Sequence, residues 1–143
     1  MRGTPYSKRR RLFFGPSGLP CTPPPFGSLV AVSLATGSIV WNTPLGDLPS
    51  AAVDHSGAPN LGGPLLTASG LVFIAATFDR TMRAFDTDSG RQLWQAPLPA
   101  GGRATPMTYE AAGRQFVVIA AGGGGAFGTG DAIVAFALPR DTR

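Results

Sequence analysis

The chain has 143 residues, of which 43% are hydrophobic and 14% charged, and it contains one cysteine and one histidine. This length allows one domain with its own core, and a single cysteine excludes an internal disulfide. The net charge of +4 arises at the N-terminus, where Arg2 and residues 8–11 supply five positive charges and leave residues 12–143 nearly neutral. A short basic run without a recognition helix or an aromatic platform predicts a solvated loop and no binding of nucleic acid.

Residues 1–28 are rich in proline, with prolines at positions 5, 16, 20, 23, 24 and 25. Proline excludes a helix and disfavours strand pairing, so we predict an irregular, basic arm over this segment. Its apolar stretch "LFF" is too short for the core of a signal peptide. Further along, four consecutive glycines and Asp131 interrupt the apolar residues 115–137, so no membrane-spanning helix is expected.

Residues 29–143 contain short runs that read as strands, separated mostly by glycine, proline, asparagine, aspartate or serine. We predict strands at residues 29–34, 39–43, 64–68, 71–76, 81–86, 92–97, 104–109, 115–121 and 132–138. Two runs, "LVFIAA" and "FVVIAA", are apolar without a break, which predicts strands covered on both faces. No segment offers a good helix of ten residues or more. The sequence therefore predicts an all-β fold.

Two eleven-residue stretches repeat along the chain: "AVSLATGSIVW" at residues 31–41 and "AFDTDSGRQLW" at residues 84–94. They lie 53 residues apart and contain both tryptophans, and Ala135 follows Ala84 after a further 51 residues. About four strands for every fifty residues, with sheets covered on both faces, is the pattern of a β-propeller blade. A sandwich would leave the repeated tryptophan unexplained. We therefore predict propeller blades.

The repeated motif has a local structural logic. Gly37 and Gly90 stand where a tight turn needs positive φ, and Thr36 or Ser89 before them can hydrogen-bond the turn backbone. Asp86 can do the same from the end of its strand, whereas the first copy has a serine at that position. The tryptophan presents a large apolar face and one N–H group that needs a partner. These roles are structural and not catalytic.

The motif resembles the tryptophan-docking motif of the eight-bladed propellers in pyrroloquinoline-quinone (PQQ) dehydrogenases. The longer stretches "PNLGGPLLTASGLVFIAATFDRTMRAFDTDSGRQLW", "LPAGGRATPMTYE" and "FVVIAAGGGGAFGTGDAIVAFALP" resemble the C-terminal part of the membrane-bound glucose and quinate/shikimate dehydrogenases. This resemblance implies about two to three blades of such a propeller over residues 29–143.

The resemblance also implies an activity. Enzymes of this family take a hydride from a sugar or polyol onto PQQ, which a calcium ion helps to hold, and pass the electrons to ubiquinone at the periplasmic face of the inner membrane. Their catalytic carboxylate and calcium ligands lie upstream of the region that this chain matches. We therefore expect no catalytic or metal-binding residue here, no tight binding of PQQ or calcium, and no activity of the isolated chain.

Four residues are implied as cofactor-binding: Asn60, Leu61 and Gly62 in "PNLGGP", and Asp79 in "AATFDR". An ordinary turn entering a strand is the alternative for the first three, and a strand-end turn residue is an equal alternative for Asp79. The sequence departs from the family pattern at Gly124, where a histidine is usual, and two residues are missing from the loop that follows. This departure puts the handling of substrate in doubt.

Other readings of the sequence are weaker. The spacing of Gly123, Gly125 and Gly128 matches a dinucleotide-binding motif, but a strand-like segment follows where that motif needs a helix. His55 and Ser56 are neighbours on extended backbone and so point to opposite faces, which argues against a catalytic pair. A non-catalytic β-repeat module that binds partners remains the alternative function. In either case, open sheet edges predict self-association or poor solubility.

Overall fold

The computed structural model describes residues 3, 5–7, 13–48, 50–51, 54–125 and 128–139. Its strands form three antiparallel sheets, with the orders β1-β2, β3-β4-β5-β6 and β7-β8-β9. The strands are β1 (Ser28–Val32), β2 (Ile39–Pro44), β3 (Leu65–Leu66), β4 (Leu71–Ile74), β5 (Thr81–Asp86), β6 (Gln92–Pro97), β7 (Met107–Ala111), β8 (Arg114–Gly122) and β9 (Asp131–Phe136). All nine predicted strands are present, and the all-β prediction is confirmed.

One predicted strand is displaced along the chain. The run at residues 104–109 was expected to pair throughout, but β7 begins at Met107. Pro106 has no N–H to give to a ladder, so pairing starts only after it. Ahead of it, Gly102 makes an isolated parallel bridge to Gly122 instead. The strand ends later than predicted, at Ala111.

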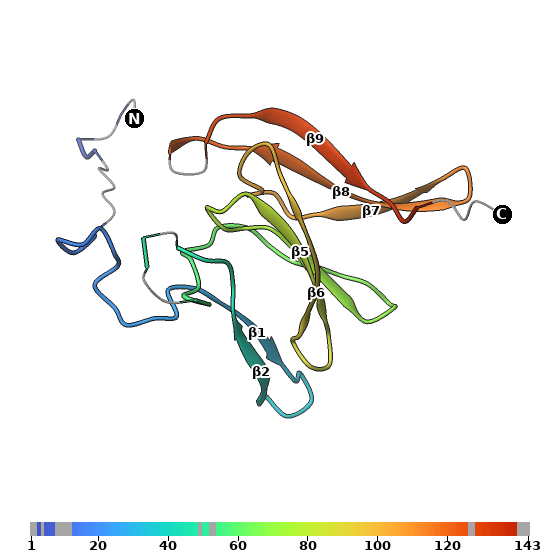
Figure 1. Cartoon of the computed structure of the whole chain (residues 1–143), viewed down its shortest axis with the longest axis horizontal. Coiled ribbons are helices and arrows are strands. Elements are labelled where there is room, and N and C mark those ends of the chain that lie inside the picture. The colour runs from blue at the N-terminus through green and yellow to red at the C-terminus, as the bar shows by residue number, and fades with distance from the viewer. Residues whose placement is uncertain are drawn as a thin grey trace.

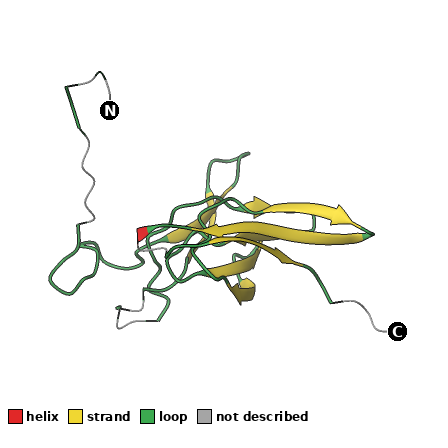
Figure 2. Ribbon diagram, turned by 90° about the horizontal axis from the view of Figure 1, so that it is seen from above, coloured by secondary structure: helices red, strands yellow, loops and turns green. Residues whose placement is uncertain are grey.

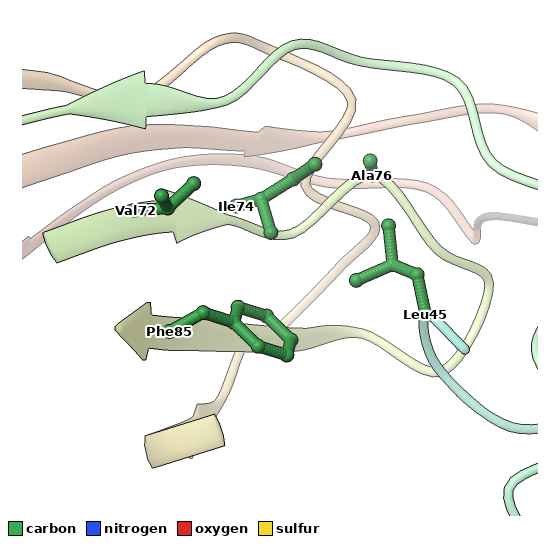
Figure 3. Packing of buried hydrophobic residues seen from close by; sticks show 5 residues of the cluster. All are labelled: Leu45, Val72, Ile74, Ala76 and Phe85. Carbon is green, nitrogen blue, oxygen red and sulfur yellow. The ribbon is translucent and has the colours of Figure 1, made fainter. Parts of the chain in front are cut away.

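The three sheets stack through two apolar cores, with the four-stranded sheet between the β1–β2 hairpin and the β7–β9 sheet (Figure 1). The first core lies between the hairpin and the four-stranded sheet and contains Leu45, Val72, Ile74, Ala76 and Phe85, as Figure 3 shows. The second lies between the four-stranded and three-stranded sheets and contains Ala75, Met82, Leu98, Ile119 and Ala121. The middle sheet is thus covered on both faces.

The two unbroken apolar runs differ in burial. In the first run, residues 74–76 are all buried, as predicted for a strand with two covered faces. In the second run Ala120 is exposed, although its neighbours Ile119 and Ala121 are buried. In the described part of the chain, a sheet packs on one face only of the three-stranded sheet. The prediction of two covered faces therefore fails for β8.

The repeated motif has the same backbone geometry in both copies. Ala31 pairs with Trp41 and Ala84 with Trp94, and the ladder is irregular directly after each alanine. The Trp41 indole Nε1 donates a hydrogen bond to the Thr87 carbonyl oxygen at 2.8 Å. This contact joins the hairpin to the turn of the next sheet, and it supplies the partner that the indole N–H was expected to need.

The third sheet repeats three strands of the second. Val72 pairs with Phe85 and Phe73 with Ala84 in β4–β5, while Val117 pairs with Phe136 and Val118 with Ala135 in β8–β9. β8 and β9 thus correspond to β4 and β5. In the residues that the structure describes, no fourth strand corresponding to β6 pairs with β9.

The described residues 13–27 before β1 run as loop to one side of the sheets (Figure 2), with one isolated bridge between Phe14 and Pro20. Cys21 is exposed and free. The basic run at residues 8–11 lies outside the described residues. No helix in the described part of the chain is long and apolar enough to cross a membrane.

Candidate functional site

The chain connections alternate between two ends of the stacked sheets. Turns join β1 to β2, β3 to β4, β5 to β6 and β7 to β8 at one end. The described residues of the other connections, at 45–64, 75–80, 98–106 and 123–130, share the other end (Figure 1). Backbone contacts tie these loops together, since the Ala76 amide donates to the Gly102 carbonyl oxygen at 2.8 Å. All four residues implied as cofactor-binding lie at this loop end. The fold therefore provides one surface on which they could act.

The backbone of the segment Asn60–Gly62 is held firmly against the strand end at residues 76–77. Asn60 makes an antiparallel bridge to Thr77, and the Leu61 amide donates to the Ala76 carbonyl oxygen at 2.8 Å. Gly62 has φ +152°, and a side chain there would place its Cβ 3.1 Å from the Arg103 carbonyl oxygen. A glycine is required at this close approach.

The side chains of the same segment are open to solvent. Leu61 is 48% exposed, and Asn60 is also exposed. The Asn60 side-chain nitrogen lies close to Gly27, 2.8 Å from where a Cβ on that residue would be. The segment thus presents an apolar side chain and an amide to solvent on a fixed backbone.

Asp79 is in a different situation, because protein groups occupy both of its carboxylate oxygens. Oδ1 accepts hydrogen bonds from Thr77 Oγ1 at 2.6 Å and from Arg83 Nη1 at 3.2 Å. Oδ2 accepts from Arg83 Nη2 and from the Asp47 amide at 3.2 Å. Burial raises the pKa of this carboxyl, but the hydrogen bonds and the charge of Arg83 outweigh it and hold the pKa below its ordinary value.

The structure thus separates the four predicted site residues into two groups. Asn60, Leu61 and Gly62 share one loop with exposed side chains, while Asp79 sits in an ion pair with Arg83. Sequence reasoning missed Arg83 and Thr77. A signal was present, because Arg83 is a charged residue inside the buried run "MRAF" of a central strand.

The weaker sequence readings find no support in the described residues. His55 is exposed, whereas Ser56 is buried and its hydroxyl bonds the Leu48 amide and the Gly57 carbonyl oxygen. The described segment that follows the glycine-rich loop is the strand β9, which begins at Asp131, whereas a dinucleotide-binding motif needs a helix there. No group of three or more histidine, cysteine, aspartate or glutamate residues in the described part of the chain could hold a metal ion.

An apolar groove of about 1050 Å³ lies away from the loop end, between the second and third sheets. Trp94 lines it and meets the Phe136 ring edge-on, with 5.1 Å between the ring centroids. Trp94 occupies the same position in its sheet as Trp41 but is 39% exposed. Trp41 contacts the turn between β5 and β6 of the next sheet. The groove beside Trp94 thus lies where the corresponding turn, between β9 and a fourth strand of the third sheet, would be placed.

Three sheets stack face to face, and the motif tryptophans of the first two point toward the next sheet, which defines an arc of a β-propeller. The chain matches the family described as "PQQ: Glucose/ethanol/alcohol dehydrogenase, beta-propeller domain" over residues 1–117. It belongs to this family of PQQ dehydrogenase propellers.

The relatives support this assignment over almost the whole chain. The chain is 48% identical to the quinoprotein glucose dehydrogenase of Escherichia coli (strain K12), over 99% of this chain and 19% of that protein. It is 39% identical to the quinate/shikimate dehydrogenase (quinone) of Acinetobacter baylyi, over 98% of this chain and 19% of that protein. The chain therefore spans about a fifth of the length of these relatives.

Solved structures agree. The quinohemoprotein alcohol dehydrogenase of Comamonas testosteroni matches with a TM-score of 0.63 and 30% identity, over 85% of this chain and 18% of that chain. A quinohemoprotein alcohol dehydrogenase of Pseudomonas putida HK5 matches with a TM-score of 0.56 and 34% identity, over 70% and 13%. The prediction of partial quinoprotein propeller blades is confirmed.

Proposed function

We propose that this chain forms part of a PQQ-dependent dehydrogenase that oxidises a sugar or polyol and passes the electrons to ubiquinone at the periplasmic face of the inner membrane. The observation that carries the proposal is its identity of 39–48% with glucose and quinate/shikimate dehydrogenases over nearly its whole length. The non-catalytic β-repeat module is not favoured, because those relatives are dehydrogenases.

Within such an enzyme, the segment Asn60–Gly62 contributes to the cofactor site. When bound, PQQ supplies the acceptor for two electrons and a proton. The exposed Leu61 side chain offers an apolar contact for a planar ring system, the Asn60 amide offers hydrogen bonds, and Gly62 lets the backbone approach closely. The calcium ligands of the enzyme are proposed to lie in its remaining part, outside this chain.

The isolated chain should bind its cofactor weakly for the same reason. Calorimetry with PQQ and calcium is expected to show no binding tighter than about micromolar, because one loop contributes too few contacts. A sub-micromolar affinity would contradict this division of the site.

A chimera tests the activity itself. This chain replaces the matching region of the Escherichia coli quinoprotein glucose dehydrogenase, and oxidation of glucose is measured with and without PQQ. We expect PQQ-dependent activity that is absent when the region is deleted. A chimera that folds and binds PQQ but oxidises neither glucose nor quinate would favour the interaction module instead.

We also propose that the chain folds as an arm over residues 1–28 and propeller blades over residues 29–143, and that the isolated chain self-associates. The outward faces of the first and third sheets support self-association. These faces carry exposed apolar side chains, including Val30, Val40 and Ile133.

A further inference from the structure

A buried arginine lies in the middle of the central sheet. Arg83 is 5% exposed, and its neighbours in β5, Met82 and Ala84, are buried as well. A buried guanidinium is costly unless it is paired and hydrogen-bonded. Its side chain turns back toward the loop end, where it bonds the Asp79 carboxylate and, at 3.2 Å, the Thr77 hydroxyl oxygen. Although Arg83 lies in a strand, its side chain therefore stabilises residues of a loop and does not contribute to the apolar core.

The ion pair also contacts the loop that follows β2, the last strand of the first sheet. Asp79 accepts a hydrogen bond from the amide of Asp47, 32 residues earlier in the chain. Gly46, next to Asp47, has φ +72°, and a Cβ there would lie 2.7 Å from the Thr77 side chain and 3.0 Å from Asp79. The loop after β2 is thus fitted closely against Thr77 and Asp79, with no room for a side chain between them.

The same network borders the segment Asn60–Gly62. Thr77 makes the backbone bridge to Asn60, and the preceding residue, Ala76, accepts the hydrogen bond of the Leu61 amide. Ala76 has φ +56°, a strained conformation for alanine that persists only where the surroundings enforce it. Thr77, which follows it, is anchored through its hydroxyl to Asp79 and Arg83. The acceptor of the Leu61 amide is therefore held in place by the ion pair next to it.

We propose that Thr77, Asp79 and Arg83 form a positioning network that fixes the segment Asn60–Gly62 at the loop end. Asp79 then acts through the backbone and is not itself a cofactor ligand. The relevance of this network to catalysis rests on the proposed function, in which that segment meets the cofactor. The network itself is a property of this chain and can be tested without cofactor.

Hydrogen exchange followed by mass spectrometry tests the network on the full chain. We expect Asp79→Asn to accelerate exchange of the Leu61 and Asp47 amides about tenfold, since it weakens the charge-assisted contacts to the Asp47 amide and to Thr77, which follows the acceptor of the Leu61 amide. Gly90→Ala is the matched control, because it disturbs the fold at the opposite, tight-turn end. In that control, Leu61 and Asp47 should exchange within about twofold of the wild-type rate.

The outcomes separate the two roles of Asp79. Equal acceleration in Asp79→Asn and Gly90→Ala would mean that the ion pair contributes general stability only, and no acceleration of Leu61 would mean that it does not hold the segment. Either result overturns the proposal. Failure of the folded chimera to oxidise either glucose or quinate would count against the proposed function and leave this network standing.

A second pair of variants covers the case in which Asp79→Asn does not fold. Thr77→Val removes the hydroxyl that bonds Asp79 and keeps the shape of the side chain, whereas Thr77→Ser keeps the hydroxyl. We expect faster exchange of Leu61 in Thr77→Val, by about tenfold, and the wild-type rate in Thr77→Ser. Equal rates in the two variants would overturn the proposal.

Discussion

Gly37 and Gly90 occupy the same place in successive copies of the tryptophan motif but have different surroundings. Both have positive φ, +70° and +68°. A Cβ on Gly90 would lie 2.6 Å from the Trp41 ring, whereas one on Gly37 would meet nothing within 4 Å. We expect Gly90→Ala to lower the free energy of unfolding by about 3 kcal/mol and Gly37→Ala by about 1 kcal/mol, since only the first adds a clash to the backbone strain. Urea denaturation measures both, and equal losses would contradict the contact between Trp41 and Gly90.

Asp79 should make the stability of the chain depend on acid pH. Its folded pKa lies below the ordinary value, so its contribution is present above the unfolded pKa and is lost as pH falls through the folded pKa. At pH 7 we expect Asp79→Asn to lower the free energy of unfolding by about 3 kcal/mol, because it leaves a buried guanidinium without its counter-charge.

The difference between this variant and the wild type should shrink as pH falls below the ordinary aspartate pKa of about 3.9, where the unfolded chain takes up the proton, and should disappear below the lower folded pKa. Denaturation at pH 7 and at pH 3 measures it. Asp131→Asn is the control, since it removes a carboxylate at an exposed position at the start of β9. A loss for Asp79→Asn that is the same at both pH values would contradict the assigned role of the charge.

Local and long-range contacts differed in how far the sequence could predict them. The turn around Asp86 was predictable, because its carboxylate accepts from residues two and three positions ahead. The engagement of Asp79 was not, because its contact to Asp47 spans 32 residues and depends on how two sheets stack. A carboxylate near a cofactor loop and a carboxylate that positions that loop look alike in a sequence.

At the level of strands, alternation and turn residues were sufficient to locate all nine elements. They could not predict which sheet faces would be covered. The runs of β4 and β8 are almost identical in composition, yet Ala75 is buried and Ala120 is exposed. The difference comes from the neighbouring sheets, because the second sheet packs between two others and the third does not.

The two tryptophans differ because Trp41 meets a turn of the four-stranded sheet, whereas Trp94 faces a sheet with three strands in the described residues. We expect Trp41→Phe to lower the free energy of unfolding by about 2 kcal/mol, because it removes the hydrogen bond to Thr87 and leaves that carbonyl without its donor. Trp94→Phe should cost less than about 1 kcal/mol, since Trp94 is half-exposed and no such bond fixes it. Fluorescence supplies a second check: Trp41, measured in Trp94→Phe, should emit at shorter wavelength than Trp94, measured in Trp41→Phe. The reverse order would contradict this account of sheet stacking.

The whole molecule is an arc with two unlike ends. Strand alternation places Val30 and Val40 on the face of the hairpin that points away from the second sheet. On the third sheet, Ile133 and the stacked rings of Tyr109 and Phe116 lie on the outward face. In a complete propeller each such face would be covered by the next blade, so both are suited to pack against a sheet.

Two unlike ends predict head-to-tail association of the isolated chain. The outward face of the hairpin on one copy would pack on the third sheet of another, which is a heterologous contact that continues from copy to copy. We expect sedimentation velocity to show species that grow with concentration. Val40→Lys and Ile133→Lys, at positions 58% and 72% exposed, should each leave the chain monomeric, since burying a charge in the contact is costly. Gln95→Lys, on the exposed edge strand β6, adds the same charge without removing apolar surface and should change nothing.

Mixing the two variants distinguishes this arrangement from a symmetric one. Val40→Lys retains an intact third sheet and Ile133→Lys an intact hairpin face, so one copy of each should combine into a dimer that cannot extend. Each variant alone should stay monomeric at the same total concentration. If association were isologous through one face, one variant would remain fully associated and mixing would create no new dimer. That result would contradict head-to-tail stacking, and with it the expectation that the sheets of this chain associate as blades do.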